Sequence, residues 1–405
     1  MKKISRLVLA FSCVLLSFSV LGCSKSQKSS SSKKSENIEL TVWESLDGPD
    51  EFIKRAAAKY EESHPNIHIK FVNVEVGDAA GTIALDGPAD VGPDLFAAPH
   101  DKLGELVNGG HILATRNPDE VKAKVISSCA SALTFNGVMY GYPVSAETYA
   151  LFYNKNLISE NEVPKTWEDL KSWSVQFNAK NPGKNAFMMD VGSGYYTIIF
   201  TTMNGNRLFG KDGSDTTKTY LNTADAIKGM EFFQSLREIL DVPAADLTTG
   251  TVDGAFQKGT AAMHITGLWN VKNFENAGLD FGVAPLPSLP GDNTPSSSFS
   301  GTRAMFVSAY SYHPEEAADF AEFLISEEMQ QLRFELTGAM PSINTTVSSP
   351  YMPGFIEQLN YAFPMPSIPE MSTFWSAMDS ASKNIWNGAD VKSELDACDK
   401  SILGK

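Results

Sequence analysis

An alternation of strand and helix patterns, which begins near residue 40, constrains the fold of this chain more than any other feature. A strand is expected at 40–43 and a helix at 50–63, with Phe52, Ala56 and Tyr60 on one face and Pro65 after its end. Apolar and polar residues then alternate from 67 to 71, which is typical of a second strand. Strand, helix and strand in this order predict an α/β architecture with a mainly parallel sheet.

The same alternation starts again near residue 150. Strands are expected at 150–153, 261–265 and 305–307, with further helices that begin at Thr166, at Thr223 and near Pro314. The globular part begins near residue 38, and it is longer than one hydrophobic core usually supports. We therefore expect two α/β lobes, with the chain crossing between them more than once.

The first residues resemble an export signal. Lys2, Lys3 and Arg6 precede an apolar run from 7 to 21, which is shorter than the ~20 residues needed to span a bilayer. Cys23 follows Gly22, as in the lipobox of bacterial lipoproteins. We expect a signal peptide at 1–22 and lipidation of Cys23, although an ordinary signal peptide with an incidental cysteine is the alternative.

The segment after Cys23 has the composition of a tether. Residues 24–36 read SKSQKSSSSKKSE and contain no hydrophobic residue. Such a segment cannot bury a core and is expected to act as a flexible spacer, whose lysines suit anionic lipid headgroups. The sequence therefore predicts a lipid-anchored tether at 23–37 and a protein on the extracytoplasmic face of a bacterial membrane.

Charge and cysteine content exclude some functions. The formal net charge is −15, and it becomes more negative without the basic signal region, which disfavours nucleic acid as a partner. Cys129 and Cys398 are the only cysteines after Cys23, and they form no Cys-x-x-Cys motif. We expect no metal and no cofactor, and leave open whether these two cysteines form a disulfide.

No sequence motif indicates catalysis. The chain lacks a Gly-x-Ser-x-Gly elbow, a His-Glu-x-x-His helix and a glycine-rich phosphate loop. His100 beside Asp101 is more often a loop pair than a catalytic dyad. A glycosidase needs only two placed carboxylates, and the sequence singles out no such pair. We therefore expect no catalytic residues.

Aromatic residues near turns, together with nearby polar residues, are typical of a sugar site. These aromatic residues are Trp43, Tyr195, Tyr196, Trp269, Phe374 and Trp375, which we expect at strand ends or in loops. Core packing is the simpler explanation for any single tryptophan. Flat rings, however, stack on the C–H face of a pyranose, and carboxylates bind its hydroxyls. Sites of this composition usually lie at domain interfaces.

These residues occur in segments that resemble the maltose- and maltodextrin-binding proteins of bacterial ABC importers. The likeness covers about 40–400 and is densest at 92–104, 142–155, 164–168 and 365–375. The last stretch reads MPSIPEMSTFW and is the most particular to the maltodextrin branch. The resemblance implies a two-lobed periplasmic-binding-protein-like fold, with a ligand cleft between lobes joined by crossing hinge segments.

The resemblance also implies a set of ligand contacts. Carboxylates and a base would bond sugar hydroxyls, and three aromatic plates of the second lobe would stack on glucosyl faces. The residues concerned are Asp47, Asp101, Lys102, Glu147, Tyr195, Trp269 and Trp375. The implied lobes are 38–147 with 288–336, and 148–287 with 337–405.

Several positions depart from the family pattern. Ala98 replaces a tryptophan plate, Ser193 a glutamate, Gly48 a lysine and Asp379 an arginine. Lys102 stands where an arginine is usual, and Gly81 with Thr82 where an acidic pair is usual. Each lost stack or hydrogen bond could cost ~1 kcal/mol or more, so affinity and preferred chain length depend on these positions.

The resemblance predicts a monomeric lipoprotein that captures maltooligosaccharides and delivers them to the transmembrane subunits of an ABC permease. Three alternatives stay open. The first is a protein of the same fold that binds a different oligosaccharide, and the second is a cell-surface glycosidase. The third is a receptor for a metal or a polyamine, although clustered metal ligands are not evident.

Overall fold

The computed structural model describes residues 37–405. The expected signal peptide, Cys23 and the tether up to residue 36 lie outside the described residues. Within residues 37–405, two large hydrophobic cores divide the molecule into two lobes. The first core holds residues between Leu40 and Val144 and between Ala304 and Met329. The second core holds most of the buried residues from Tyr149 onward, apart from those between Ala304 and Met329.

One continuous sheet of nine strands runs through both lobes. The strand order is β2-β1-β3-β10-β6-β8-β7, with β11 beside β10 and β9 beside β6. The bounds are β1 (Ile38–Glu44), β2 (Ile67–Asn73), β3 (Leu95–Pro99), β6 (Tyr142–Asn154), β7 (Asn185–Met188), β8 (Ala261–Gly267), β9 (Phe281–Ala284), β10 (Phe299–Val307) and β11 (Phe363–Pro364). A separate small hairpin pairs β4 (Thr134–Phe135) with β5 (Val138–Met139).

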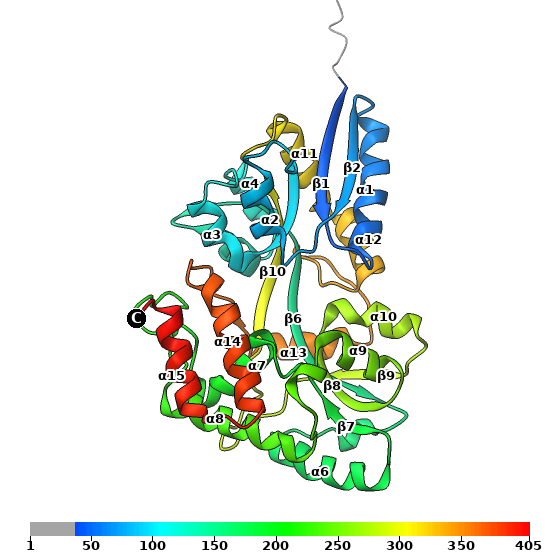
Figure 1. Cartoon of the computed structure of the whole chain (residues 1–405). Helices are drawn as coiled ribbons and strands as arrows, with labels where there is room; N and C mark the ends of the chain where they lie inside the picture. The colour runs from blue at the N-terminus through cyan, green and yellow to red at the C-terminus, as the bar shows by residue number, and fades with distance from the viewer. Residues whose placement is uncertain (1–36) are drawn as a thin grey trace, which may run out of the picture. The chain divides into compact units, whose positions relative to one another are not determined.

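The long strands β6 and β10 connect the lobes (Figure 1). In β6, Val144 packs in the first core and Tyr149 in the second. In β10, Phe299 packs in the second core and Ala304 in the first, so this crossing lies later than the expected return to the first lobe at residue 288. The prediction of lobes joined by crossing segments is confirmed.

The prediction of a mainly parallel sheet is wrong. The pairs β1–β2, β1–β3, β7–β8 and β10–β11 are parallel, whereas β3–β10, β10–β6, β6–β8 and β6–β9 are antiparallel. The reason is the return of the chain through the middle of the sheet, because β6 leaves the first lobe and β10 re-enters it in the opposite direction. Local strand and helix signals do not contain this information.

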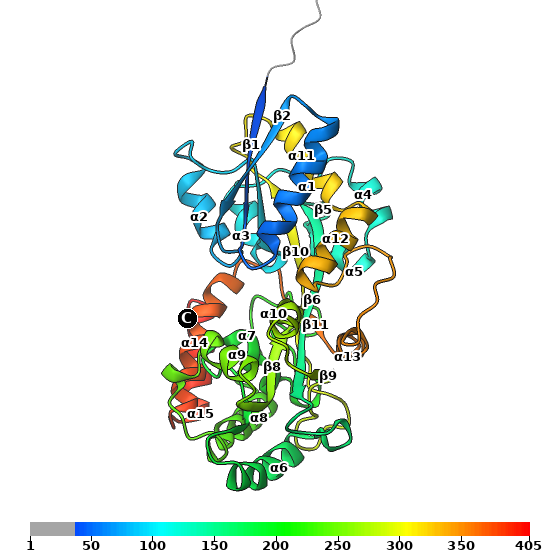
Figure 2. The same cartoon turned by 90° about the vertical axis from the view of Figure 1, so that its right-hand side faces the viewer.

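Helices cover the sheet in each lobe. In the first lobe, α1 and α11 lie on one side of the strands and α2 on the other (Figure 2). The first-lobe helices are α1 (Pro49–Ser63), α2 (Ala79–Asp86), α3 (Leu103–Asn108), α4 (Pro118–Lys124), α5 (Ser127–Ala132), α11 (Pro314–Leu324) and α12 (Glu327–Thr337). The second-lobe helices are α6 (Trp167–Lys180), α7 (Gly194–Thr197), α8 (Ala224–Ser235), α9 (Thr249–Gln257), α10 (Val271–Asn276), α13 (Met352–Leu359), α14 (Met371–Trp386) and α15 (Val391–Ile402).

The predicted helix starts agree with the structure. The Thr166 hydroxyl accepts a hydrogen bond from the Asp169 backbone N–H at 3.0 Å, and the Thr223 hydroxyl accepts one from Ala226 at 3.2 Å. Each threonine thereby satisfies one backbone N–H that the first helical turn leaves free. Pro314 is the first residue of α11, where its missing N–H costs no hydrogen bond.

Candidate functional site

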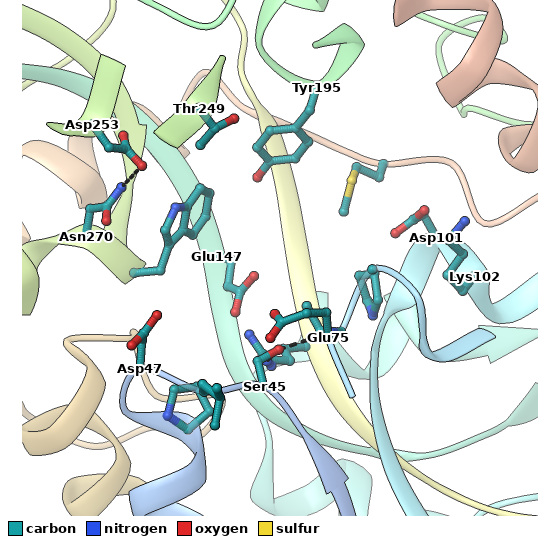
Figure 3. A pocket seen from close by; sticks show the side chains of 18 of the residues that line it. Ser45, Asp47, Glu75, Asp101, Lys102, Glu147, Tyr195, Thr249, Asp253 and Asn270 are labelled. Atoms are coloured by element: carbon teal, nitrogen blue, oxygen red, sulfur yellow. Dashed lines mark hydrogen bonds between the residues drawn. The ribbon is translucent and has the colours of Figure 1, made fainter. Parts of the chain in front are cut away.

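A cavity of about 730 Å³ is lined by residues of both lobes. It has the size of an oligosaccharide or drug-sized ligand site. The structure brings all the predicted ligand contacts to this one cavity, although they come from distant parts of the chain. They are Asp47, Asp101, Lys102, Glu147, Tyr195, Trp269 and Trp375. Figure 3 shows Asp101 and Lys102 at one end, with Glu147 and Tyr195 nearer the middle.

Three aromatic rings of the second lobe form a row along the cavity. Tyr195 lies in the middle, with its ring centroid 6.1 Å from that of Trp269 and 6.3 Å from that of Trp375. The Tyr149 hydroxyl donates a hydrogen bond of 2.7 Å to the Tyr195 carbonyl and supports the row from behind. The expectation of a strand end or loop is wrong for four of the aromatic residues, because Phe374 and Trp375 lie in the first turns of α14 and Tyr195 and Tyr196 lie in the short helix α7.

Gly267 sets the position of the Trp269 indole. A Cβ atom at Gly267, the last residue of β8, would lie 2.1 Å from the Trp269 ring. The backbone φ of Gly267 is −103°, which any residue can adopt. The glycine is therefore required for the space that it leaves, rather than for its conformation.

Replacing Gly267 by alanine is expected to weaken ligand binding about as much as the loss of the Trp269 side chain. The added methyl group displaces the indole from the row of rings, while the backbone of β8 stays unstrained. Calorimetric titration of Gly267→Ala, Trp269→Ala and the double variant would check this. The double variant is expected to be no weaker than Trp269→Ala alone, and additive losses would contradict the proposed coupling.

Asp379 supports the start of α7 from the neighbouring helix α14. Its Oδ1 atom accepts a hydrogen bond of 2.6 Å from the Gly194 backbone N–H, directly before Tyr195. A Cβ atom at Gly194 would lie 2.8 Å from Met378, so the two helices approach closely here. Burial raises the pKa of Asp379, and the bond from Gly194 opposes this effect. Asp379, which stands where the family pattern has an arginine, thus helps to position Tyr195.

Asp47 enters the cavity from the turn between β1 and α1. This turn has positive φ at two successive residues, 61° at Asp47 and 117° at Gly48. A Cβ atom at Gly48 would also lie 3.2 Å from the carbonyl oxygen of Leu336. Left-handed backbone and close packing both favour glycine, so the structure explains why no lysine stands at this position.

Asp101 is joined to the second lobe by a hydrogen bond. Trp375 Nε1 donates to Asp101 Oδ2 at 3.0 Å, and the neighbouring His100 Nε2 lies 2.9 Å from the Met365 carbonyl oxygen. Only 3% of Asp101 is exposed. Burial raises the pKa of Asp101, against the opposing effects of His100, Lys102 and Trp375. His100 has a structural role, since burial lowers its pKa and it also accepts a hydrogen bond from Thr302 N–H.

Replacing Asp101 by asparagine is expected to raise the free energy of unfolding at neutral pH. Because the pKa of Asp101 is raised above 3.8 in the folded protein, ionisation of this carboxyl costs stability as the pH rises. Below pH 3.8 the two proteins should be equally stable. Urea unfolding across this range would check it, with the exposed Asp212→Asn as control. A variant that becomes relatively less stable as the pH rises would contradict the assignment.

The cavity floor contains charged residues of the crossing strands. Arg303 of β10 lines the cavity, forms an ion pair with buried Glu44 and donates a hydrogen bond of 3.0 Å to the Ser45 hydroxyl. Glu147 of β6 lies close by and accepts a hydrogen bond of 2.9 Å from Ser145. Burial lowers the pKa of Arg303, but Glu44 and Glu147 outweigh this effect and the net shift is upward.

Sequence reasoning missed several residues that line the cavity. They are Ser45, Glu75, Thr249, Asp253, Asn270, Asn273, Arg303 and Met365. Two signals could have indicated some of them. Glu75 follows the end of β2 as Asp47 follows β1, and Arg303 is the only charged residue of strand β10. The polar residues of α9 carry no comparable local signal.

Other sequence candidates lie outside the cavity. Trp43 and Ala98 are buried in the first core, where Ala98 of β3 pairs with Ala304 of β10 in the sheet. Gly81 and Thr82 lie in α2, and Ser193 is the N-cap residue of α7. Asp190 is buried and accepts hydrogen bonds from the Thr249 backbone and hydroxyl.

The remaining chemistry is sparse in the part of the chain that the structure describes. Cys129 and Cys398 are both buried free thiols, and burial raises the pKa of Cys129 to about 11. Among residues 37–405, no group of three or more His, Cys, Asp or Glu side chains is placed to hold a metal ion. Within the same residues, no helix combines the length and apolarity of a transmembrane segment.

Comparison with known proteins gives the family. The family described as bacterial extracellular solute-binding protein matches residues 43–331. The chain belongs to this family. It is 31% identical over 407 residues to a galactooligosaccharide-binding protein of Bacillus subtilis, covering 97% of this chain and 95% of that protein. A maltooligosaccharide ABC transporter solute-binding lipoprotein of Streptococcus pneumoniae is 30% identical, covering 87% and 85% of the two chains.

Solved structures agree with this assignment. A cyclo/maltodextrin-binding protein in complex with maltotetraose superposes with a TM-score of 0.76 at 31% identity, covering 92% of this chain and 98% of that chain. The predicted resemblance to maltodextrin-binding proteins is thereby confirmed, as is the two-lobed fold. The matched family consists of binding proteins that act outside the cell.

Proposed function

We propose that this solute-binding protein captures an oligosaccharide in the cavity between its lobes and delivers it to the permease of an ABC importer. The observation that carries the proposal is the cavity itself. A row of three aromatic rings from the second lobe shares it with Asp47, Asp101 and Glu147. Rings for the apolar faces of sugars and carboxylates for their hydroxyls are the two features that a saccharide site needs.

A bound sugar would couple the two lobes. Tyr195, Trp269 and Trp375 would stack on sugar rings, while Asp47, Asp101, Lys102 and Glu147 would bind hydroxyl groups. A ligand that contacts both lobes at once can do so only in the closed form. Its binding therefore stabilises the closed form and shifts the population toward it. The permease would then distinguish loaded from empty receptor. The protein binds without turnover, so it acts as a receptor and not as an enzyme.

Maltooligosaccharides are the proposed ligands. The Streptococcus pneumoniae relative, named for maltooligosaccharides, and the solved complex with maltotetraose support this choice. A different oligosaccharide is the second candidate, because the Bacillus subtilis relative is named for galactooligosaccharides. The two classes differ in linkage and in the orientation of a hydroxyl group, and polar contacts distinguish such features better than stacking does.

Anchoring and lobe boundaries complete the proposal. Lipidated Cys23 would hold a monomeric receptor at the outer face of the cell membrane, and the tether at 23–37 would let it reach the permease. The lobes would be 38–147 with 288–336 and 148–287 with 337–405. The two cores support this division, except that Leu289 and Phe299 pack with the second lobe.

Isothermal titration calorimetry tests the proposed function. A protein beginning at Asn37 keeps both cores and the nine-stranded sheet. It would be titrated with maltose, maltotriose, maltotetraose and a cyclodextrin, and with a matched series of galactooligosaccharides. We expect micromolar affinity that increases with chain length in one series. No heat with either series would contradict a sugar receptor, and release of shorter sugars during long incubation would indicate a glycosidase.

A further inference from the structure

A cluster of polar side chains lies at the end of the cavity opposite Asp101. It consists of Thr249 and Asp253 of α9, Asn273 of α10, and Asn270, which directly precedes α10. In Figure 3, Thr249, Asp253 and Asn270 gather at one end, whereas Asp101 and Lys102 lie at the other. The aromatic row does not account for these residues, and neither does any predicted ligand contact.

The Asp253 carboxylate is held in a fixed orientation. Its Oδ1 atom lies 2.6 Å from His264 Nε2, and its Oδ2 atom accepts a hydrogen bond of 2.8 Å from Asn270 Nδ2. Only 1% of the His264 side chain is exposed, and its Nδ1 atom lies 3.1 Å from the Met188 carbonyl oxygen. His264 is therefore fixed through both ring nitrogens, and it fixes Asp253 in turn.

The other members of the cluster are fixed as well. The Thr249 hydroxyl donates a hydrogen bond of 2.6 Å to Asp190, and Asn273 Nδ2 donates one of 3.2 Å to Asn270 Oδ1. Asn270 also donates to the Thr266 hydroxyl at 2.8 Å. These bonds use the hydroxyl hydrogen of Thr249, both amide hydrogens of Asn270 and one of the two of Asn273, and they leave acceptor lone pairs on the Thr249 hydroxyl, on Asn273 Oδ1 and on Asp253. The cluster thus offers several acceptors whose orientation is set before a ligand arrives.

We propose that Thr249, Asp253, Asn270 and Asn273 form an additional saccharide subsite beyond Trp269. This subsite rests on the proposed function. Trp269 neighbours Tyr195 in the row of rings and Asn270 in the sequence, so a sugar chain that continues past its indole meets acceptors instead of a further ring. The hydroxyl groups of the added sugar donate to these acceptors, with the Asp253 carboxylate as the strongest of them. His264 is a positioning residue.

Such a subsite differs in kind from the aromatic part of the cavity. Stacking tolerates a change in the orientation of one hydroxyl group, whereas fixed acceptors reward one orientation and are left unpaired by another. The cluster would therefore determine both the preferred chain length and the stereochemistry of the last sugar unit. It involves none of the positions at which the chain departs from the family pattern.

The test is the dependence of affinity on chain length in Asp253→Ala and Asn273→Ala. Calorimetry would use malto- and galactooligosaccharides from disaccharide to hexasaccharide. For Asp253→Ala, we expect an approximately tenfold or larger loss of affinity for ligands long enough to reach the subsite. Binding of the shortest ligand should change less than twofold. Asn273→Ala, at a half-buried residue that donates one bond, should show the same pattern with a smaller loss.

The matched control is Asp246→Ala, an exposed aspartate outside the cavity, which should change no affinity. Equal losses for short and long ligands in both variants would indicate a purely structural role and overturn the subsite. Unchanged affinity for every ligand would overturn it as well. Absence of binding by the unmodified protein would instead refute the proposed function, and the subsite with it. Thermal unfolding of each variant would show whether it is folded.

Discussion

Replacing Trp375 by alanine is expected to weaken sugar binding by about 2–3 kcal/mol, or roughly 30- to 150-fold. Two losses combine in this variant. The row of rings loses one end, next to Tyr195. In addition, the buried Asp101 carboxylate loses the indole N–H that donates to it at 3.0 Å. Isothermal titration with the tightest-binding oligosaccharide would measure the change.

Two further variants separate these effects. Trp375→Phe keeps a ring but removes the donor, so it should lose affinity only in part. Trp173→Ala is the matched control, because Trp173 is a half-buried tryptophan of α6 that stacks on Phe177 away from the cavity. It should lower stability without changing affinity. Equal affinities for Trp375→Ala and the unmodified protein would exclude Trp375 from the binding site.

The fold could be predicted from the sequence where local signals were sufficient. Strand β2 has clear alternation, and α6 and α8 begin at threonine caps that the spacing identified. Strand direction could not be predicted, because it depends on how β6 and β10 pair in the middle of the sheet. That pairing joins residues about 150 positions apart, such as Ser300 and Thr148, and no local pattern encodes it.

The candidate site, like the fold, could be predicted from the sequence only in part. The types of residue alone indicated a sugar site, through aromatic rings and carboxylates. The family resemblance then selected seven positions, all of which line the cavity. Neither indicated Asp253, because its position depends on the contact between α9 and His264 of β8. The sequence also contained no indication of the structural role of Asp379, since its bond to the Gly194 backbone is visible only in three dimensions.

The buried charges beneath the cavity also depend on contacts between distant parts of the chain. Glu44 is fully buried in the first lobe, at the end of β1. It pairs with Arg303 of β10 and lies 3.6 Å from Nη1 of Arg333, whose side chain is 2% exposed. Arg333 also stacks over the ring of Phe52 at 5.2 Å. The Glu44 carboxylate thus faces two buried guanidinium groups that reach it from β10 and α12, and Glu147 is a second carboxylate whose charge acts on both.

Replacing Glu44 by glutamine is therefore expected to lower the free energy of unfolding by about 3–5 kcal/mol. The variant leaves Arg303 and Arg333 buried with only the Glu147 carboxylate to offset their charges, and the cost of an uncompensated buried charge exceeds that of a lost surface pair. Urea unfolding would measure the change. Glu51→Gln is the matched control, because the Glu51–Arg55 pair is exposed and should contribute less than about 1 kcal/mol. The double variant Glu44→Gln with Arg333→Met should regain part of the loss, since one of the uncompensated charges is removed. A Glu44→Gln protein as stable as the control would show that the two guanidinium groups do not depend on Glu44.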